Sequence, residues 1–214
     1  MKKKYILFDL DGTLTDSQEG IMNSIEYMLD TYGIRVEDRS RLRPWLGPPL
    51  KDSLMKYYGF DEKTALEGVG RYREYFDRQG IFENKVYPGI ENLLGQLKDR
   101  GCRLYVATSK PETAAVRIME HFGLSRYFTY IGGATLDDSR TKKGDVIRYV
   151  LGMIGDADKH EIIMVGDREN DVMGAKENGL EVIGALYGYG TREELEEAGA
   201  DYIAGTVEAI ADFV

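Results

Sequence analysis

The chain has 214 residues and a mass of 24.2 kDa, which is enough for one large domain or for one domain with an insertion. Its 43% hydrophobic residues are typical of a packed protein, and its net charge of -9 argues against nucleic acid or an anionic membrane as the main partner. Cys102 is the only cysteine, and no apolar run approaches the roughly 18 residues of a membrane helix, so we expect a cytoplasmic chain without disulfides.

The first predicted strand is "YILF", residues 5–8, and an acidic turn, "DLDGT", follows it. Asp9 and Asp11 lie two residues apart in nearly extended chain, so both side chains can point to the same side. Gly12 lets the chain turn sharply, and Thr13 can satisfy exposed backbone groups. Like charges this close repel each other, so the turn indicates a bound cation. The alternative, an Asx turn or a helix cap, accounts for one aspartate but not for two.

Residues 16–84 carry helical patterns and no convincing strand. The first pattern, "GIMNSIEYMLDTYG", has one apolar face formed by Ile21, Ile25, Met28, Leu29 and Tyr32. Two further patterns follow in "LKDSLMKYYG" and "DEKTALEGVGRYREYFDRQG". We therefore expect a helical cap domain over 16–84, inserted into a core domain formed by 1–15 and 85–214.

Strand and helix patterns alternate from about residue 88 onward. The predicted strands are "RLYVAT", "YIGG", "EIIMVGD", "EVIGAL" and "DYIAG". Helices are predicted between them, for example in "GIENLLGQLKDRG", where Ile90, Leu93, Leu94 and Leu97 share one stripe. This alternation is typical of right-handed βαβ units. We expect an α/β fold, with a Rossmann-like parallel sheet that has helices on both faces.

Polar side chains stand at the ends of the later strands or before a helix. They are Thr108, Ser109 and Lys110 after a strand expected to end near Ala107, Lys142 and Lys143 before a helix, and Asp167 and Asp171 after "IIMVG". Each group has a structural alternative, such as a helix cap, a solvated helix start or a turn. Because ligands of a parallel sheet bind beyond the carboxyl ends of its strands, these three groups together with the acidic turn at residues 9–13 indicate a single site.

With these motifs the chain resembles the haloacid dehalogenase superfamily, among the phosphatases that carry a helical cap after the first motif. "DLDGT" and "GDREND" are the specific motifs, and the resemblance covers essentially the whole chain. It implies that Asp9 is a nucleophile that becomes an aspartyl-phosphate. It also implies that Asp11 protonates the leaving alkoxide and later deprotonates water. Thr108 would hydrogen-bond the phosphoryl group, and Lys143 would neutralise it.

Three lysines are candidates for the residue that neutralises the phosphoryl group. Lys143 stands where the family's lysine usually does, directly before the helix that begins "GDVI", so it is preferred over Lys142. Lys110 comes third. Gly12 and Ser109 are expected to support the neighbouring catalytic residues.

The resemblance further implies a Mg²⁺ cofactor. Its ligands would be the carboxylates of Asp9 and Asp167 and the backbone carbonyl of Asp11, with Asp171 in the outer shell. Magnesium prefers oxygen ligands and lets clustered aspartates coexist, so the residue types agree with this implication.

The implied function is hydrolysis of a small phosphorylated metabolite, which is the expected partner. The whole chain resembles phosphoglycolate phosphatase-like proteins, while "WLGPPL" and "YGYG" resemble 5'-nucleotidases. In the cap, the loop "RPWLGPPLKDS" is expected to face the substrate, with Trp45 and Lys51 as substrate-binding candidates. For Trp45 the alternative is simple packing within the cap.

Other functions stay open at this point. Asp11 argues against dehalogenases and transport ATPases of the superfamily, but a sugar phosphomutase of the β-phosphoglucomutase type retains it. A phosphonate hydrolase would need a cap lysine such as Lys51, Lys56 or Lys63, and nothing specific supports one. A non-catalytic binding or regulatory protein on the same fold is a further alternative. The helical insertion and the order "DLDGT" argue against a response-regulator receiver.

Overall fold

The computed structural model describes residues 2–47, 49–137 and 139–214, so Pro48 of the expected cap loop lies outside the described residues. The chain divides into two compact units. Unit 1 comprises Met1–Asp16 and Val86–Val214, and unit 2 comprises Ser17–Lys85. The role of residues 16–84 as a cap over the site stays a prediction.

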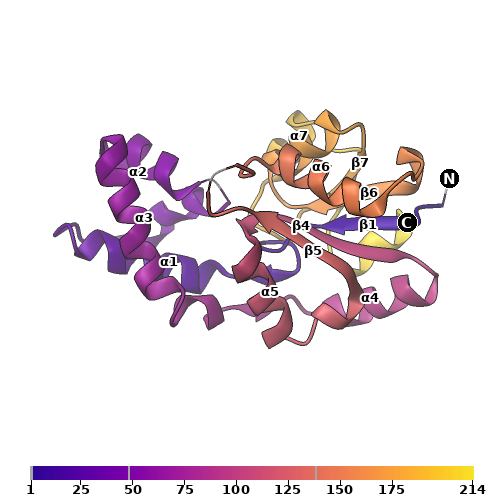
Figure 1. Cartoon of the computed structure of the whole chain (residues 1–214), viewed down its shortest axis with the longest axis horizontal. Helices are drawn as coiled ribbons and strands as arrows, with labels where there is room; N and C mark the ends of the chain where they lie inside the picture. The colour runs from indigo at the N-terminus through magenta and orange to yellow at the C-terminus, as the bar shows by residue number, and fades with distance from the viewer. Residues whose placement is uncertain (1, 48, 138) are drawn as a thin grey trace. The chain divides into compact units, whose positions relative to one another are not determined.

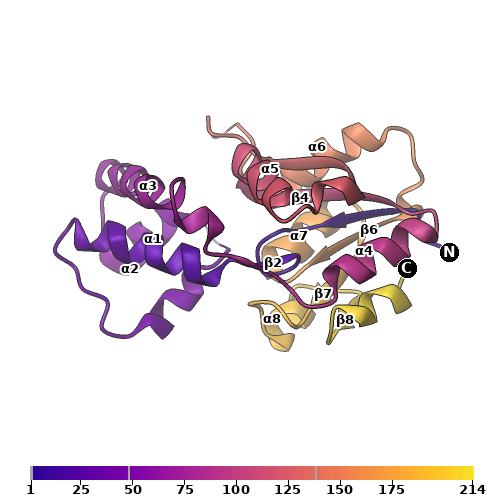
Figure 2. The ribbon, with the colours of Figure 1, turned by 90° about the horizontal axis from the view of Figure 1, so that it is seen from below.

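Unit 1 is built around a six-stranded parallel sheet with the strand order β5-β4-β1-β6-β7-β8 (Figure 1). The strands are β1 (Tyr5–Phe8), β4 (Arg103–Pro111), β5 (Phe128–Ala134), β6 (Ile162–Gly166), β7 (Glu181–Ala185) and β8 (Tyr202–Ala204). Strands β6, β7 and β8 continue the sheet beyond β1 (Figure 2). The predicted parallel sheet is confirmed, and the strand order reverses at β1, which is where sheets of this kind bind ligands.

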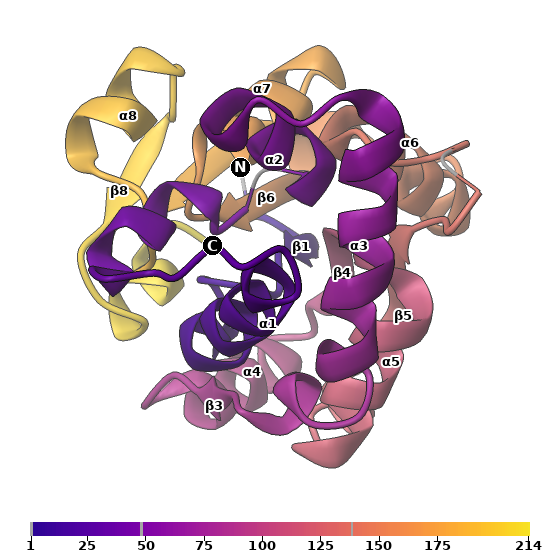
Figure 3. The same ribbon diagram turned by 90° about the vertical axis from the view of Figure 1, so that its left-hand side faces the viewer.

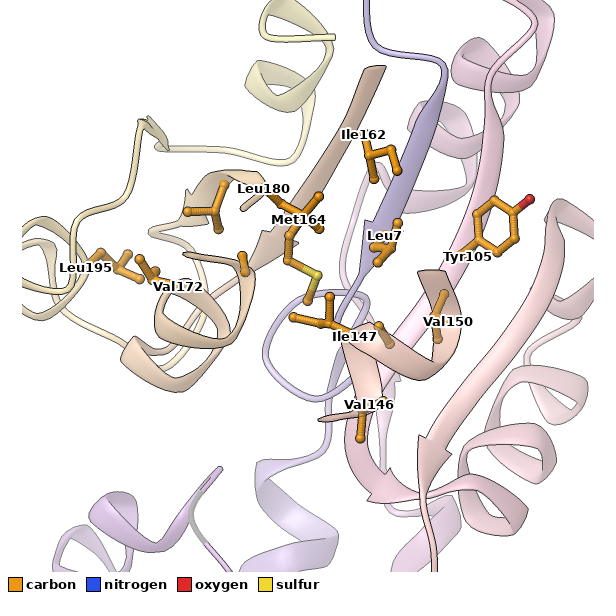
Figure 4. Close-up of a cluster of buried hydrophobic side chains, with 13 residues drawn as sticks. Leu7, Tyr105, Val146, Ile147, Val150, Ile162, Met164, Val172, Leu180 and Leu195 are labelled. Atoms are coloured by element: carbon orange, nitrogen blue, oxygen red, sulfur yellow. The ribbon is translucent and has the colours of Figure 1, made fainter. Parts of the chain in front are cut away.

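Helices cover both faces of the sheet, as predicted (Figure 1). They are α4 (Ile90–Asp99), α5 (Glu112–His121), α6 (Lys143–Ile154), α7 (Glu169–Glu177) and α8 (Arg192–Glu197), with short 3-10 helices η3 (Ser125–Tyr127), η4 (Lys159–Glu161) and η5 (Glu208–Asp212). On one face, α6 contacts β4, β5 and α7, while α7 contacts β6 and β7. Figure 4 shows the resulting core, in which Leu7 and Met164 of the sheet face Ile147 of α6. Alternation along β1 turns Ile6 and Phe8 to the opposite face.

Unit 2 is helical (Figure 3). Its elements are α1 (Gln18–Asp30), η1 (Arg39–Trp45), α2 (Leu50–Tyr58), α3 (Glu62–Phe76) and η2 (Gly80–Phe82). Ile25, Met28 and Leu29 of the predicted apolar face are buried, and α1 and α2 both contact α3. Among the described residues, no helix is long and apolar enough to cross a membrane.

A small sheet that was not predicted forms where the chain passes between the two units. It pairs β2 (Thr15–Asp16) with β3 (Lys85–Val86). Strands of two residues carry no periodic pattern, so alternation of polar and apolar residues cannot reveal them.

Candidate active site

The acidic turn after β1 lies at the edge of the sheet where β1, β4 and β6 end. The amide of Asp9 donates to the carbonyl of Val165 over 2.9 Å, so the pairing with β6 extends one residue past the strand. Gly12 has a φ of 82°, and a Cβ there would lie 2.1 Å from Oδ2 of Asp167. Glycine is therefore needed both for the backbone conformation and for the close approach of Asp167.

Lys143, the first residue of α6, joins two buried carboxylates. Its Nζ lies 2.7 Å from Oδ1 of Asp9 and 2.7 Å from Oδ1 of Asp171, and it donates to the carbonyl of Ala107 over 3.0 Å. Burial alone would lower the pKa of Lys143, but the two carboxylates outweigh burial and hold the pKa above its ordinary value. Lys143 is therefore a fixed ammonium group beside Asp9, whereas Lys142 is exposed.

Asp167 and Asp171 follow β6 and have separate hydrogen-bond partners. Oδ1 of Asp167 accepts from the hydroxyl of Thr13 over 3.0 Å, and Oδ2 accepts from the amide of Tyr189 over 2.8 Å. Oδ2 of Asp171 accepts from the amides of Asp167 and Arg168, each over 3.0 Å. Asp171 thus fixes the backbone of the turn that carries Asp167.

The residues present fit a divalent cation. Among the described residues, Asp9, Asp167 and Asp171 each offer an oxygen within 4.8 Å of the others, and all three are buried. Burial raises the pKa of Asp9 to about 6, against the opposing effect of Lys143, and burial also raises the pKa of Asp167 well above its usual value. A cation would compensate these charges. Asp171 is held by Lys143 and two amides, and the choice of Asp9 and Asp167 as the carboxylate ligands stays a prediction.

The prediction that the second strand of the core ends near Ala107 is wrong, because β4 runs on to Pro111. Ala107 pairs with Gly132 and Pro111 pairs with Ala134, so β4 advances by four residues over a stretch in which β5 advances by two. Thr108 is 2% exposed within this irregular stretch, and its hydroxyl accepts from the amide of Lys110 over 3.2 Å. Sequence patterns show polar residues here but not the shift in register, which depends on the partner strand.

The third-ranked lysine, Lys110, is also inside the site. Its Nζ donates to Oδ2 of Asp11 over 2.7 Å, and its side chain is only 6% exposed. The two residues are 99 positions apart in the chain, so local spacing gave no signal for this contact. The site therefore contains two lysines with buried side chains, of which Lys143 pairs with Asp9 and Asp171 and Lys110 pairs with Asp11.

The loop "YGYG", residues 187–190, packs closely against Asp167 and holds its carboxylate in place. This role was not predicted from the sequence. A Cβ on Gly188 would lie 2.4 Å from Cβ of Asp167, and one on Gly190 would lie 2.1 Å from its carbonyl oxygen. The hydroxyl of Tyr187 donates to the carbonyl of Thr13 over 2.9 Å. Burial, with Asp167 nearby, raises the pKa of Tyr187, which keeps this donor protonated. The glycines at the alternate positions 188 and 190 were the sequence feature that could have indicated this close approach.

Trp45 and Lys51 lie in unit 2. Trp45 is 4% exposed, stacks on Tyr57 with ring centroids 5.6 Å apart, and meets the ring of Tyr58 edge-on at 5.6 Å. These contacts favour the packing alternative for Trp45. Nζ of Lys51 lies 2.7 Å from Oε1 of Glu62 on α3. A role for either residue in substrate binding stays a prediction.

Trp45→Ala is expected to destabilise the protein by about 3–5 kcal/mol, because it opens a cavity among aromatic rings. Urea unfolding followed by circular dichroism measures this loss. Leu66→Ala is the control, since Leu66 is 50% exposed and its truncation should change little. An unchanged unfolding midpoint together with an altered order of ester preference would instead assign Trp45 to substrate binding.

Comparisons with known proteins show the family of the chain. The haloacid dehalogenase-like hydrolase family matches residues 6–185 of the chain. A 5'-nucleotidase of Pseudomonas aeruginosa is 48% identical over 190 residues, which cover 89% of this chain and 86% of that protein. The tyrosine-protein kinase PtkA of Mycobacterium tuberculosis is 35% identical over 97% of this chain and 71% of that protein.

A solved structure shares both the fold and much of the sequence. The crystal structure of a predicted phosphatase from Clostridium acetobutylicum is 51% identical and superposes with a TM-score of 0.95, covering 100% of this chain and 98% of that one. The family match includes β4, β6, all but the first residue of β1, and the residues at the carboxyl ends of these strands. The chain belongs to the haloacid dehalogenase-like hydrolase family.

Proposed function

We propose that this phosphatase hydrolyses small phosphate monoesters with Asp9 as its nucleophile and with nucleoside 5'-monophosphates as its substrate class. The observation that carries the proposal is the buried Asp9 carboxylate beside the Lys143 ammonium, at the reversal point of the sheet. The 48% identity to a 5'-nucleotidase favours nucleotides over phosphoglycolate.

The geometry supports a role for each residue in the first half of the reaction. Oδ1 of Asp9 has an ion pair with Lys143 but no hydrogen bond of good geometry among the described residues, so it keeps a lone pair for attack. As an Asp9 oxygen bonds to phosphorus, the bond from phosphorus to the leaving oxygen breaks, and Asp11 gives that oxygen a proton. Lys143 and the Thr108 hydroxyl stabilise the phosphoryl oxygens.

In the second half, Asp11 takes a proton from water, and the resulting hydroxide attacks phosphorus. The bond between phosphorus and Asp9 breaks, which restores the Asp9 carboxylate and releases phosphate. Asp9, Asp167 and the Asp11 carbonyl would hold Mg²⁺. When bound, the ion supplies positive charge against the phosphoryl oxygens.

Asp167→Ala is expected to raise the Mg²⁺ concentration needed for half-maximal activity, because a buried carboxylate ligand is lost. Isothermal titration of the variant with Mg²⁺ should show weaker binding, independently of activity. Asp99→Ala, at an exposed position at the end of α4, is the matched control. Full activity of the wild-type protein in excess chelator would contradict a magnesium requirement.

A substrate panel tests the proposed class. Nucleoside 5'-monophosphates, 2-phosphoglycolate, p-nitrophenyl phosphate and glucose 1-phosphate are compared by kcat/KM, and we expect the nucleotides to have the highest values. Conversion of glucose 1-phosphate to glucose 6-phosphate would support the phosphomutase alternative. Phosphorylation of a tyrosine peptide by ATP would support an activity like that named for the mycobacterial relative. No turnover of any ester by folded protein would support the non-catalytic alternative.

A further inference from the structure

An irregularity in β4 places Lys110 in the site. The extra residues of β4 between Ala107 and Pro111 shift its register against β5, and irregularities of this kind redirect side chains. On the neighbouring strand, a Cβ at Gly133 would lie 2.6 Å from the carbonyl oxygen of Lys110 and 2.6 Å from Cα of Glu112. Glycine is thus the residue that lets the backbone of Lys110 approach β5 so closely.

The side chain of Lys110 gives the two carboxylate oxygens of Asp11 different surroundings. Its Nζ lies 2.7 Å from Oδ2, in an ion pair whose side chains are 6% and 16% exposed. Oδ1 of Asp11 is buried and has no hydrogen-bond partner among the described residues. A buried polar atom without a partner is costly and calls for an explanation in terms of function.

We propose that Lys110 is a positioning residue that holds Oδ2 of Asp11 and thereby leaves Oδ1 as the atom that exchanges the proton. This inference rests on the proposed function, in which Asp11 is the acid and base. Without the ammonium group, the carboxyl group of Asp11 can rotate about its terminal bond, and neither oxygen is held toward the leaving group.

The proposed proton path balances over the two half-reactions. The proton on Oδ1 of Asp11 passes to the leaving oxygen as the electron pair of the broken phosphorus–oxygen bond moves onto that oxygen. Asp11 is then a carboxylate, still paired through Oδ2 with Lys110. Oδ1 next accepts one proton of the attacking water, so Asp11 regains its starting form when phosphate leaves.

Two esters of similar shape test the inference. Phenyl phosphate has a more basic leaving oxygen than p-nitrophenyl phosphate and depends more on proton donation. Values of kcat/KM report the steps up to the first irreversible one, the transfer to Asp9. We expect Lys110→Met to lower kcat/KM for phenyl phosphate about tenfold more than for p-nitrophenyl phosphate. The ratio of the two values in one preparation does not depend on the fraction of folded protein.

Matched variants complete the experiment. Lys98→Met, at an exposed position on α4, should leave the ratio of the two kcat/KM values unchanged. Lys110→Arg keeps a cationic donor, so its ratio should lie between those of Lys110→Met and the wild-type protein. An equal loss for both esters would overturn the inference, because Lys110 would then act on the phosphoryl charge. An unchanged ratio and rate would overturn it as well. Asp9→Asn separates the two proposals: retained turnover in that variant would overturn the proposed function itself and this inference with it.

Discussion

Asp9→Asn is expected to lower kcat by about 10,000-fold or more while the fold stays intact, because an amide is a poor nucleophile of nearly the same shape. In the site, Asp9 is 8% exposed and its Oδ1 lies 2.7 Å from Nζ of Lys143. The amide keeps the volume, and Lys143 still has Asp171 as a partner. Steady-state kinetics with p-nitrophenyl phosphate, together with circular dichroism of the variant, provide the measurement.

Asp99→Asn is the matched control, since it makes the same chemical change at an exposed position of α4. We expect wild-type kinetics from it. A folded Asp9→Asn protein with wild-type turnover would show that another group accepts the phosphoryl.

The second large effect is expected for Lys143→Ala. It should lower kcat/KM by about 100-fold or more, because the phosphoryl group loses a fixed ammonium group. It should also lower the free energy of unfolding by about 3–5 kcal/mol, because Asp9 and Asp171 become buried carboxylates without their cation. Ester hydrolysis and urea unfolding on the same preparations separate the two effects.

Lys142→Ala is the control for this experiment, because the neighbouring side chain is exposed and has the same charge. Little change is expected in either measurement. Lys110→Ala should lose less activity than Lys143→Ala, since Lys110 pairs with Asp11 and not with Asp9. A larger loss at Lys142 or Lys110 would reverse this order of the three lysines.

Much of the fold could be predicted because its signals are local. Strands β1 and β6 are short apolar runs bounded by acid or glycine, and the stripe of Ile90, Leu93, Leu94 and Leu97 on α4 is buried as expected. The acidic residues of the site could also be found from sequence, because Asp9 and Asp167 directly follow predicted strands. The carboxyl ends of parallel strands meet at one edge of the sheet, so positions far apart in the chain could be assigned to one place.

The contacts that were missed depend on tertiary geometry. Lys110 reaches Asp11 because β4 changes register against β5 and Gly133 makes room for it. The loop 187–190 reaches Asp167 because two glycines remove the Cβ atoms that would collide with it. Neither the register shift nor the need for glycine can be predicted from the spacing of hydrophobic residues in the segment concerned.

Trp45 illustrates a different limit of local patterns. A tryptophan in a proline-rich loop suits stacking on a ligand as well as packing in a core. Only the positions of Tyr57 and Tyr58 on α2 distinguish the two, and they favour packing.

In the proposed reaction, Asp9 carries the phosphoryl group during turnover. Wild-type protein turning over p-nitrophenyl phosphate with Mg²⁺ is quenched in acid and reduced with borohydride, which converts an aspartyl-phosphate to homoserine. Mass spectrometry of the peptides then locates the change. We expect homoserine at position 9 and nowhere else. Homoserine at another aspartate, or phosphate release with an unmodified Asp9 at every quench time, would contradict it.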